Sequence, residues 1–504
     1  MAPAVELRGI TKAFPGVVAN DQIDFSAEKA EIHGLLGENG AGKTVLMSVL
    51  YGLYRPDSGR ILVDGEEAKI HGPGDALRLG IGMVHQHFML IPSLTVVENI
   101  ILGREPVRNG FLLDRERMLS DVSEFCSRYK LDVDLEAPVY QLPVGVQQRV
   151  EILKALYRGA DVLILDEPTA VLTPGETDEL FNAVRALKAD GRTVIFISHK
   201  LKEVLAICDR VTVLKRGRVV GTVNAWETNE EQLAEMMVGR KIVYEFTKEA
   251  ECGVEPVLTV SGLECLSDRG IPALRDVDLE VCGSEILGLA GVEGNGQTEL
   301  VEAIMGLRKV TGGSIRLGSD DITDASPQEK IRKGISHIPE DRYRRAIVPD
   351  FSVLENLILG SQRDRFTGNG VSIDFDAAEH FSMETVKDYQ ITTPGLETPL
   401  RHLSGGNQQR VVVAREFSRS PRVIIAAQPT RGLDVGATEY VRRKLVEMRD
   451  GGVGVLLISA DLDEIWALSD RIAVIYEGRI VAVRDADETD TSEIGLLMAG
   501  AGHD

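Results

Sequence analysis

The chain has few cysteines, and none of them has the spacing of a metal site. Its 504 residues include five cysteines, with no Cys-x-x-Cys pair and no accompanying histidine pattern. Disulfide frameworks and zinc sites both show such regular spacings. We therefore expect reduced, buried cysteines that bind no metal.

The chain also lacks any long apolar run. Its longest apolar stretches, such as residues 453–458, fall far short of the roughly 20 residues that a membrane-spanning helix needs. Residues 1–6 lack the basic and apolar regions of a signal peptide. We therefore expect no membrane-spanning segment and no signal peptide.

Positive charge is in short supply. The chain has 56 Lys and Arg residues against 78 Asp and Glu residues, a net charge of −22 that is spread along the sequence. Such a surface favours solubility and disfavours nonspecific binding to nucleic acid. We expect no nucleic-acid partner, and the length favours two or more domains.

What the sequence does contain is a duplication. Residues 96–103 return as residues 353–360, and the Gly-rich residues 37–44 return as residues 291–298. Such self-similarity predicts two homologous domains in tandem. We place them at residues 1–240 and 256–504, with a short polar linker at residues 241–255 that ends before Pro256.

Each half has the pattern of an α/β protein. In the first half an apolar strand, residues 31–36, leads into the Gly-rich loop and a helix over residues 43–51. Two further apolar strands follow at residues 162–165 and 193–197. Fully apolar strands that alternate with helices predict a parallel sheet covered on both faces.

The Gly-rich loop of the first half is a complete phosphate-binding loop. Glycines let backbone N–H groups approach phosphates closely, and the helix that follows adds its positive end. Lys43 supplies a cation for the phosphates, and Thr44 supplies a hydroxyl for Mg²⁺. The predicted ATP-binding residues of this loop are Gly37, Glu38, Asn39, Gly40, Ala41, Gly42, Lys43 and Thr44.

Two carboxylates and a histidine follow the later strands of the first half. Asp166 and Glu167 come directly after residues 162–165, where one carboxylate can hold Mg²⁺ and the next can activate water. The alternative is that both merely end a strand. His199 stands at the end of the next strand, where a histidine is more often a core residue than a catalytic one.

The second half contains a Ser-Gly-Gly motif, Ser404, Gly405 and Gly406, ahead of a predicted helix. A hydroxyl and free N–H groups at a helix start form an anion site, although an ordinary serine N-cap would look the same. The first half has Pro143 at the corresponding position, which offers neither hydroxyl nor N–H.

Together these motifs resemble the nucleotide-binding domain of ABC transporters, and the resemblance covers nearly the whole chain twice. It implies a RecA-like parallel-sheet core, an antiparallel β subdomain and a helical signature subdomain in each half. It also implies that the two halves pair within the chain, so that each ATP meets the P-loop of one half and the signature of the other. It further implies adenine stacking by Phe14, Mg²⁺ binding by Gln86, Thr44 and Asp166, and catalysis by Glu167, His199 and Gln86.

The second half departs from this family pattern wherever chemistry is done. Gln297 replaces the P-loop lysine, and Ala427 and Gln428 replace the two carboxylates. The predicted degenerate site comprises Gln297, Thr298, Glu340, Ala427, Gln428 and Ala460, together with Pro143. We therefore expect one ATP-hydrolysing site, built from Lys43 and its neighbours with Ser404 in trans, and one poor site.

Two fused ABC domains without a membrane segment resemble the ATPase subunit of bacterial importers for simple sugars and nucleosides. Residues 85–90, 142–145 and 426–431 favour the nucleoside-type branch over a ribose- or galactose-type importer. The resemblance implies ATP and Mg²⁺ as cofactors, two integral-membrane permease subunits, a periplasmic or lipoprotein substrate-binding protein, and a position on the cytoplasmic face of the bacterial cell membrane. It places the contacts with the permeases near residues 88–94 and 342–349.

Two other classes remain open. A soluble twin ABC protein acting on ribosomes or nucleic acid would carry a long charged linker helix and commonly a basic surface, which this chain lacks. A regulatory ATP-binding module without turnover would lack the catalytic set that the first half contains.

Overall fold

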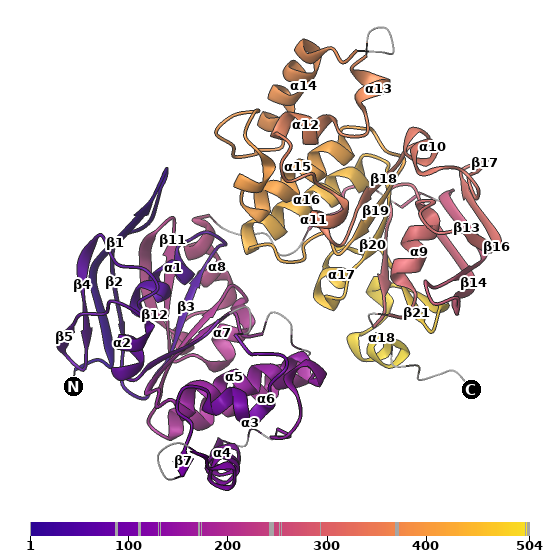
Figure 1. Cartoon of the computed structure of the whole chain (residues 1–504). Helices are drawn as coiled ribbons and strands as arrows, with labels where there is room; N and C mark the ends of the chain where they lie inside the picture. Colours follow the sequence, from indigo (N-terminus) through magenta and orange to yellow (C-terminus); the bar gives the residue numbers. More distant parts are fainter. Residues whose placement is uncertain are drawn as a thin grey trace. The chain divides into compact units, whose positions relative to one another are not determined.

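The chain forms two compact units, Met1–Ile242 (unit 1) and Val243–Asp504 (unit 2), in a computed structural model (Figure 1). The structure describes residues 2–500 except 86–88, 109–111, 130, 132, 170–171, 173, 241–245, 251, 254, 293, 368–371 and 499. Both units have the same two kinds of sheet and the same grouping of helices. The duplication in sequence is therefore a duplication in structure.

The main sheet of unit 1 has six strands in the order β12-β11-β3-β10-β9-β6. Neighbours run parallel except at the β11–β12 edge pair, which is antiparallel. Its strands are β3 (Ile32–Gly37), β6 (Ile81–Val84), β9 (Val162–Asp166), β10 (Thr193–Ser198), β11 (Arg210–Lys215) and β12 (Arg218–Asn224). The strand and helix expected around the Gly-rich loop are confirmed to within one residue at each end, because β3 is followed by α1 (Lys43–Leu50).

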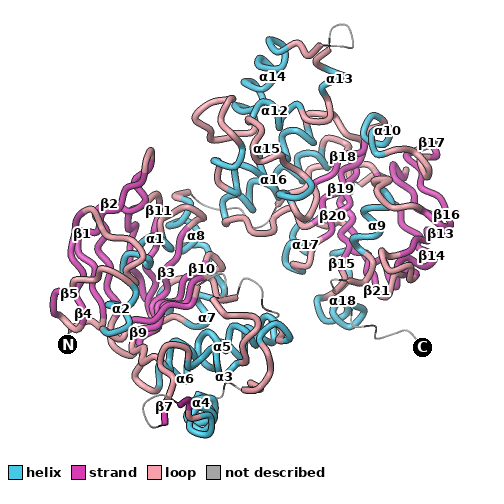
Figure 2. Tube along the Cα trace, in the orientation of Figure 1, coloured by secondary structure: helices cyan, strands magenta, loops and turns pink. Residues whose placement is uncertain are grey.

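A second sheet of unit 1 is antiparallel, in the order β2-β1-β4-β5. It contains β1 (Val5–Phe14), β2 (Val17–Ala27), β4 (Ser58–Val63) and β5 (Glu66–Ala68), and a separate hairpin pairs β7 (Val107–Arg108) with β8 (Leu112–Leu113). The remaining helices are α2 (Pro73–Arg78), α3 (Val96–Ile101), α4 (Arg115–Tyr129), α5 (Val144–Tyr157), α6 (Pro174–Ala189), α7 (Leu201–Ile207) and α8 (Glu230–Val238). Figure 2 shows α3, α4 and α5 grouped away from the four-stranded antiparallel sheet β2-β1-β4-β5, as the ABC resemblance implied.

Unit 2 repeats both sheets, as β18-β19-β20-β15-β21-β22 and β14-β13-β16-β17. Its strands are β13 (Pro256–Leu266), β14 (Pro272–Cys282), β15 (Ile286–Ala290), β16 (Val310–Leu317), β17 (Asp320–Asp321), β18 (Ile335–Ile338), β19 (Val423–Ala427), β20 (Gly454–Ile458), β21 (Arg471–Tyr476) and β22 (Arg479–Asp485). Its helices are α9 (Gln297–Ile304), α10 (Pro327–Arg332), α11 (Arg342–Arg345), α12 (Val353–Ile358), α13 (Gln362–Arg365), α14 (Phe375–Asp388), α15 (Gly405–Phe417), α16 (Val435–Asp450), α17 (Leu462–Leu468) and α18 (Thr491–Met498).

The apolar strands of the main sheets are buried on both faces. In β19, Val423 and Ile425 pack into the core shared with the antiparallel sheet, while Ile424 and Ala426 pack into the core beneath α15 and α16. Successive side chains of a strand point to opposite faces, so only a continuous apolar run can fill two cores. This packing fixes where the sheet ends and hence where the polar residues beyond it lie.

The segment before β13 packs against the rest of unit 2. Lys248 Nζ donates to Asp470 Oδ1 at 3.0 Å, and Arg449 Nη1 donates to the carbonyl of Ala250 at 2.7 Å. These contacts hold Lys248 and Ala250 against the rest of unit 2. Across the described part of the chain, no helix is both long and apolar enough to cross a bilayer.

Lys330 in α10 is a buried cation, and its removal is expected to stabilise unit 2. Its side chain is 0% exposed, and burial lowers its pKa from 10.5 to about 8. Folding therefore costs roughly 3 kcal/mol while Lys330 is protonated, and this cost falls as the pH rises from about 8 to 10.5. The acceptor of its hydrogen bond, the Ala303 carbonyl, also accepts from Gly306 N, so it keeps a partner without the lysine.

We predict that Lys330→Met raises the free energy of unfolding at pH 7 by up to roughly 3 kcal/mol and has little effect at pH 10.5. Calorimetric unfolding of the full chain at both pH values measures this difference. The control is Lys333→Met, on the exposed side of the same region, where Lys333 Nζ pairs with Asp320 at 2.8 Å and removal should matter little. A Lys330→Met variant that is less stable at pH 7 would contradict the prediction.

Candidate active site

The phosphate-binding loop of unit 1 has a backbone that its glycines make possible. Gly40 and Gly42 have φ values of 81° and 100°, which residues with a side chain rarely adopt. A Cβ on Gly42 would lie 2.3 Å from the Ala19 carbonyl oxygen on β2. The loop therefore needs glycine at this position to pack against the antiparallel sheet.

Lys43 lies across this loop. The residue is 6% exposed, and its Nζ donates to the carbonyls of Gly37 at 2.7 Å and Glu38 at 3.0 Å. The ammonium group is therefore held at the first residues of the loop, where a phosphate bound by the loop N–H groups would meet it.

Thr44 and Asp166 form an oxygen-rich pair beside Lys43. Thr44 Oγ1 donates to Asp166 Oδ1 at 3.4 Å, and Asp166, at the end of β9, is 3% exposed. Burial raises the pKa of Asp166, against the opposing effects of the Thr44 hydrogen bond and the charge of Lys43. A desolvated carboxylate gains from a nearby cation, and hydroxyl and carboxylate oxygens are the ligands that Mg²⁺ prefers. The donor set therefore fits Mg²⁺.

Glu167 and His199 come together at the carboxyl ends of adjacent strands β9 and β10. His199 Nδ1 and Glu167 Oε1 are 3.0 Å apart. Glu167 has a φ of 47°, and its N–H donates to the Ile197 carbonyl at 3.0 Å, so the backbone turns sharply there. His199 therefore contacts Glu167, and its catalytic role stays a prediction.

Glu167 remains an ionised carboxylate. Burial alone would raise its pKa, but the hydrogen bond to His199 and the charges of His199, Lys43 and Lys200 outweigh burial and hold the pKa of Glu167 below its usual value. An ionised carboxylate beside a phosphate site can orient water or take its proton. The role of Glu167 in hydrolysis stays a prediction.

The two signature positions differ in how they start their helices. Ser404 caps α15, and its Oγ accepts from Asn407 N at 3.4 Å and from Asn407 Nδ2 at 3.0 Å. Both bonds use the oxygen as acceptor, so the hydroxyl proton can be donated to an anion. Pro143 precedes α5 without a side-chain cap. The N-cap interpretation of Ser404 therefore holds, and it is compatible with anion binding at Gly405 and Gly406.

Of two further predicted residues, Phe14 and Gln86, the structure describes Phe14. Phe14 ends β1, where its ring packs edge-on against Tyr54 with centroids 5.3 Å apart and Lys12 Nζ lies 5.6 Å from the Phe14 ring. Phe14 therefore lies on the antiparallel sheet, and its stacking on adenine stays a prediction. Gln86 lies outside the described residues.

The second loop is closed by a neutral side chain. Gln297 Nε2 donates to the Val292 carbonyl at 3.0 Å, and Gln297 Oε1 accepts from Asn295 N at 3.1 Å. Val292 corresponds to Glu38 in the duplication, so Gln297 bonds the carbonyl equivalent to one that Lys43 bonds. The exchange removes a cation from the loop.

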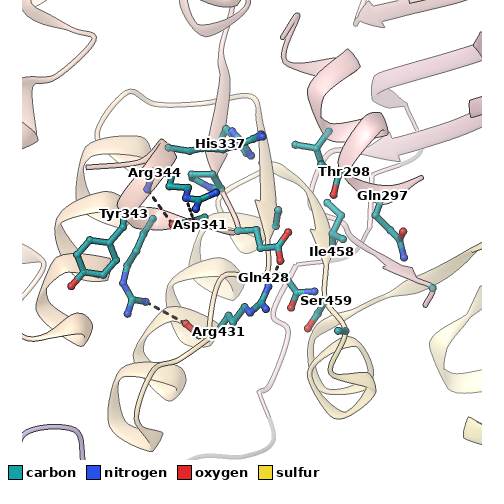
Figure 3. Close-up of a pocket in the computed structure, with 18 of the residues that line it drawn as sticks. Gln297, Thr298, His337, Asp341, Tyr343, Arg344, Gln428, Arg431, Ile458 and Ser459 are labelled. Carbon is teal, nitrogen blue, oxygen red and sulfur yellow. Dashed lines mark hydrogen bonds and ion pairs between the residues drawn. The ribbon is translucent and has the colours of Figure 1, made fainter. Parts of the chain in front are cut away.

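The other degenerate positions lack the reactive side chains of their counterparts in unit 1, although Gln428 keeps the backbone conformation of Glu167. Gln428 has a φ of 48°, and its N–H donates to the Ile458 carbonyl at 2.7 Å, as at Glu167. Ala427 ends β19, and Ala460 follows β20. Together with Gln297, Thr298 and Glu340 these residues line a cavity of about 510 Å³ (Figure 3). The structure thus brings together the degenerate residues of unit 2.

The sequence interpretation did not include the arginines of this cavity. Arg431 pairs with Glu340, and Arg342 Nη1 donates to the Arg431 carbonyl at 3.3 Å. The sequence does contain a signal for them, because residues 342–345 include three arginines and begin two residues after Glu340, the position equivalent to Gln86. From the sequence alone, the ABC resemblance predicts only a contact with a membrane partner for that segment.

A phosphate-binding loop after a parallel strand, with carboxylates at the end of a neighbouring strand, defines a P-loop nucleotide-binding protein. Comparison with known proteins gives the family. The ABC transporter family matches residues 20–170 and 274–431, once in each unit. The chain therefore belongs to the ABC transporter family, and it is an ATP-binding transport ATPase.

Three relatives match almost end to end. The guanosine import ATP-binding protein NupO of Bacillus subtilis (strain 168) is 49% identical over 99% of this chain and 98% of the relative. The glucose import ATP-binding protein TsgD13 of Haloferax volcanii is 47% identical over 99% and 96%. The nucleoside import ATP-binding protein NupA of Lactococcus lactis subsp. cremoris is 44% identical over 98% and 98%. The match to these relatives therefore spans both ABC domains of this chain.

Proposed function

We propose that this chain is the ATPase subunit of an importer for nucleosides, and that it has a single ATP-hydrolysing site. The observation that carries the second part is the 3.0 Å pair of Glu167 and His199 in unit 1, which has Gln428 and Ala460 as its counterparts in unit 2. At this strand end unit 1 has a carboxylate that can activate water, whereas unit 2 has the amide of Gln428.

In this proposal Lys43 and the loop N–H groups bind the ATP phosphates, and Phe14 stacks on adenine. Thr44, Asp166 and Gln86 hold Mg²⁺, which neutralises phosphate charge when bound. Glu167 orients and deprotonates the attacking water, and His199 holds the Glu167 carboxylate in place.

Unit 2 contributes the signature. We propose that Ser404, Gly405 and Gly406 meet the γ-phosphate in trans, because α15 begins with a hydroxyl and unobstructed N–H groups whereas α5 follows a proline. The intact P-loop and the intact signature lie in opposite units, and this complementary retention supports their pairing.

The remaining assignments concern the partners of the chain and its location in the cell. We propose that the chain binds two integral-membrane permease subunits on the cytoplasmic face of the bacterial membrane, through residues near 88–94 and 342–349, and works with a periplasmic or lipoprotein substrate-binding protein. Residues 86–88 lie outside the described part of the chain, whereas 342–345 form α11. ATP binding and hydrolysis would then close and reopen the units.

The substrate assignment is supported by the guanosine and nucleoside importers among the relatives, while the glucose importer supports the sugar alternative. The chain itself contains no substrate contact, because specificity belongs to the other subunits. The domain limits, residues 1–240 and 256–504 with a linker at 241–255, also stay a proposal.

The test is uptake by the complex purified with its own permeases and binding protein. We predict ATP-dependent uptake of guanosine that exceeds uptake of ribose or glucose at least tenfold. Faster uptake of a monosaccharide would overturn the nucleoside assignment and support the sugar alternative. ATP-independent uptake, or purification with ribosomes instead of membrane subunits, would overturn the importer proposal itself.

A further inference from the structure

The cavity of unit 2 carries an excess of positive charge. It lies between the second Gly-rich loop and the carboxyl ends of β18, β19 and β20 (Figure 3). Its charged lining residues are Glu340, Asp341, Arg342, Arg344, Arg345 and Arg431. Four guanidinium groups against two carboxylates give 4 − 2 = +2. A concave site with this charge attracts anions.

Arg431 lies where the metal chemistry of unit 1 has been lost. It forms an ion pair with Glu340, the residue at the position of Gln86 in the duplication, and Figure 3 shows its side chain reaching toward Gln428. Ala427 stands at the position of the metal-binding Asp166. Unit 2 therefore has no carboxylate at the strand end where unit 1 has Asp166. The Arg431 guanidinium therefore lies beside Glu340, the residue at the position of Gln86, in a cavity that also contains Ala427.

The cavity wall also offers polar atoms that lack partners. In the described part of the chain, His337 Nε2 and Arg342 Nε are buried without a hydrogen bond. Both residues line the cavity, from β18 and α11 respectively. Burial lowers the pKa of His337 to about 4, so the ring is neutral at physiological pH. Buried polar atoms without partners are uncommon in folded proteins, so these two mark a polar wall of the cavity.

The second loop itself is a weak phosphate cradle. Gln297 puts a neutral side chain at the lysine position, so the cationic groups that can balance phosphate charge lie on the opposite wall. Guanidinium groups bind phosphate through parallel N–H···O bonds and stay charged at all physiological pH values.

We propose that this cavity binds a nucleoside di- or triphosphate without a divalent metal ion, and that Arg431 supplies the positive charge that Mg²⁺ supplies in unit 1. The proposal deepens the one-site function above, and it rests on the asymmetry of the two units. Glu340 competes with the ligand for Arg431, so the ion pair sets the affinity of the cavity.

The test is calorimetric binding of ATP to the full chain carrying Lys43→Ala, which removes the phosphate cation of unit 1. In EDTA we expect saturable binding, and Mg²⁺ should strengthen it no more than threefold. Adding Arg431→Ala should weaken binding at least tenfold, the loss expected for a charge-assisted hydrogen bond. Adding Glu340→Gln should strengthen it, because the competing carboxylate is removed.

The matched control is Arg332→Ala, which breaks an exposed ion pair with Asp364 (3.0 Å) outside the cavity and should leave ATP affinity unchanged. Glu340→Gln also separates this proposal from a metal site, because a Mg²⁺ ligand at Glu340 would make that variant bind more weakly in Mg²⁺. Absence of binding in EDTA, a stronger Mg²⁺ enhancement, or unchanged affinity in Arg431→Ala would overturn the proposal. None of these results would touch hydrolysis at unit 1, which depends on Glu167.

Discussion

Replacing Glu167 by glutamine should lower ATP turnover of the assembled complex at least roughly 100-fold, the scale of general-base catalysis. Glutamine preserves the size of the side chain and its polar contact with His199, but it cannot accept the proton of water. The carboxylate is kept ionised by its hydrogen bond with His199 and by the charges around it, so the substitution removes a functioning base. Phosphate release at saturating Mg²⁺ and ATP measures the effect.

The matched control is Gln428→Ala, at the equivalent backbone position of unit 2, where the N–H donates to Ile458 as Glu167 N donates to Ile197. We expect turnover to change less than about twofold, because no water is activated there. Near wild-type turnover in Glu167→Gln would show that another group, in either unit, activates water.

The second large effect is expected at Gly405, the first residue of α15. An aspartate there would place a negative charge at the helix start that we assign to the γ-phosphate, and would also attract the Arg342 guanidinium, whose Nη2 lies 2.9 Å from the position of a Cβ on Gly405. Losing one anion-stabilising contact typically costs roughly 100-fold in rate. Gly405→Asp should therefore reduce turnover about as severely as Glu167→Gln, even though it lies in the other unit.

Val144 provides the control for Gly405, because it begins α5 as Gly405 begins α15. Val144→Asp should change turnover less than about twofold, since unit 1's signature would serve a site that does not hydrolyse ATP. The reverse pattern, with Val144→Asp the more damaging, would assign hydrolysis to the P-loop of unit 2. Melting temperatures of both variants show whether either result merely reflects unfolding.

Much of the fold could be predicted because its signals are local. The apolar strands, the Gly-rich loops and the duplication all follow from neighbouring residues, and β3, β9 and β10 appear within a residue or two of their expected limits. The meeting of Glu167 with His199 was also predictable, since parallel neighbouring strands bring their carboxyl ends to one edge.

The remaining features depend on contacts that sequence patterns do not encode. That Gln297 folds back onto Val292 and Asn295 depends on a rotamer, and a glutamine could as easily have pointed outward. The pairing of Arg431 with Glu340 joins residues that are far apart in the chain. Lys330 is another example, because an amphipathic pattern treats a lysine as exposed whereas α10 buries it against α9.

The most direct test of a single hydrolysing site built from both units is the amount of ADP trapped by vanadate after one round of hydrolysis in the assembled complex. We predict one ADP per chain in the wild type, the same amount in Gln428→Ala and Val144→Asp, and almost none in Glu167→Gln or Gly405→Asp. Two trapped ADP molecules per chain, or normal trapping in Gly405→Asp, would contradict the account.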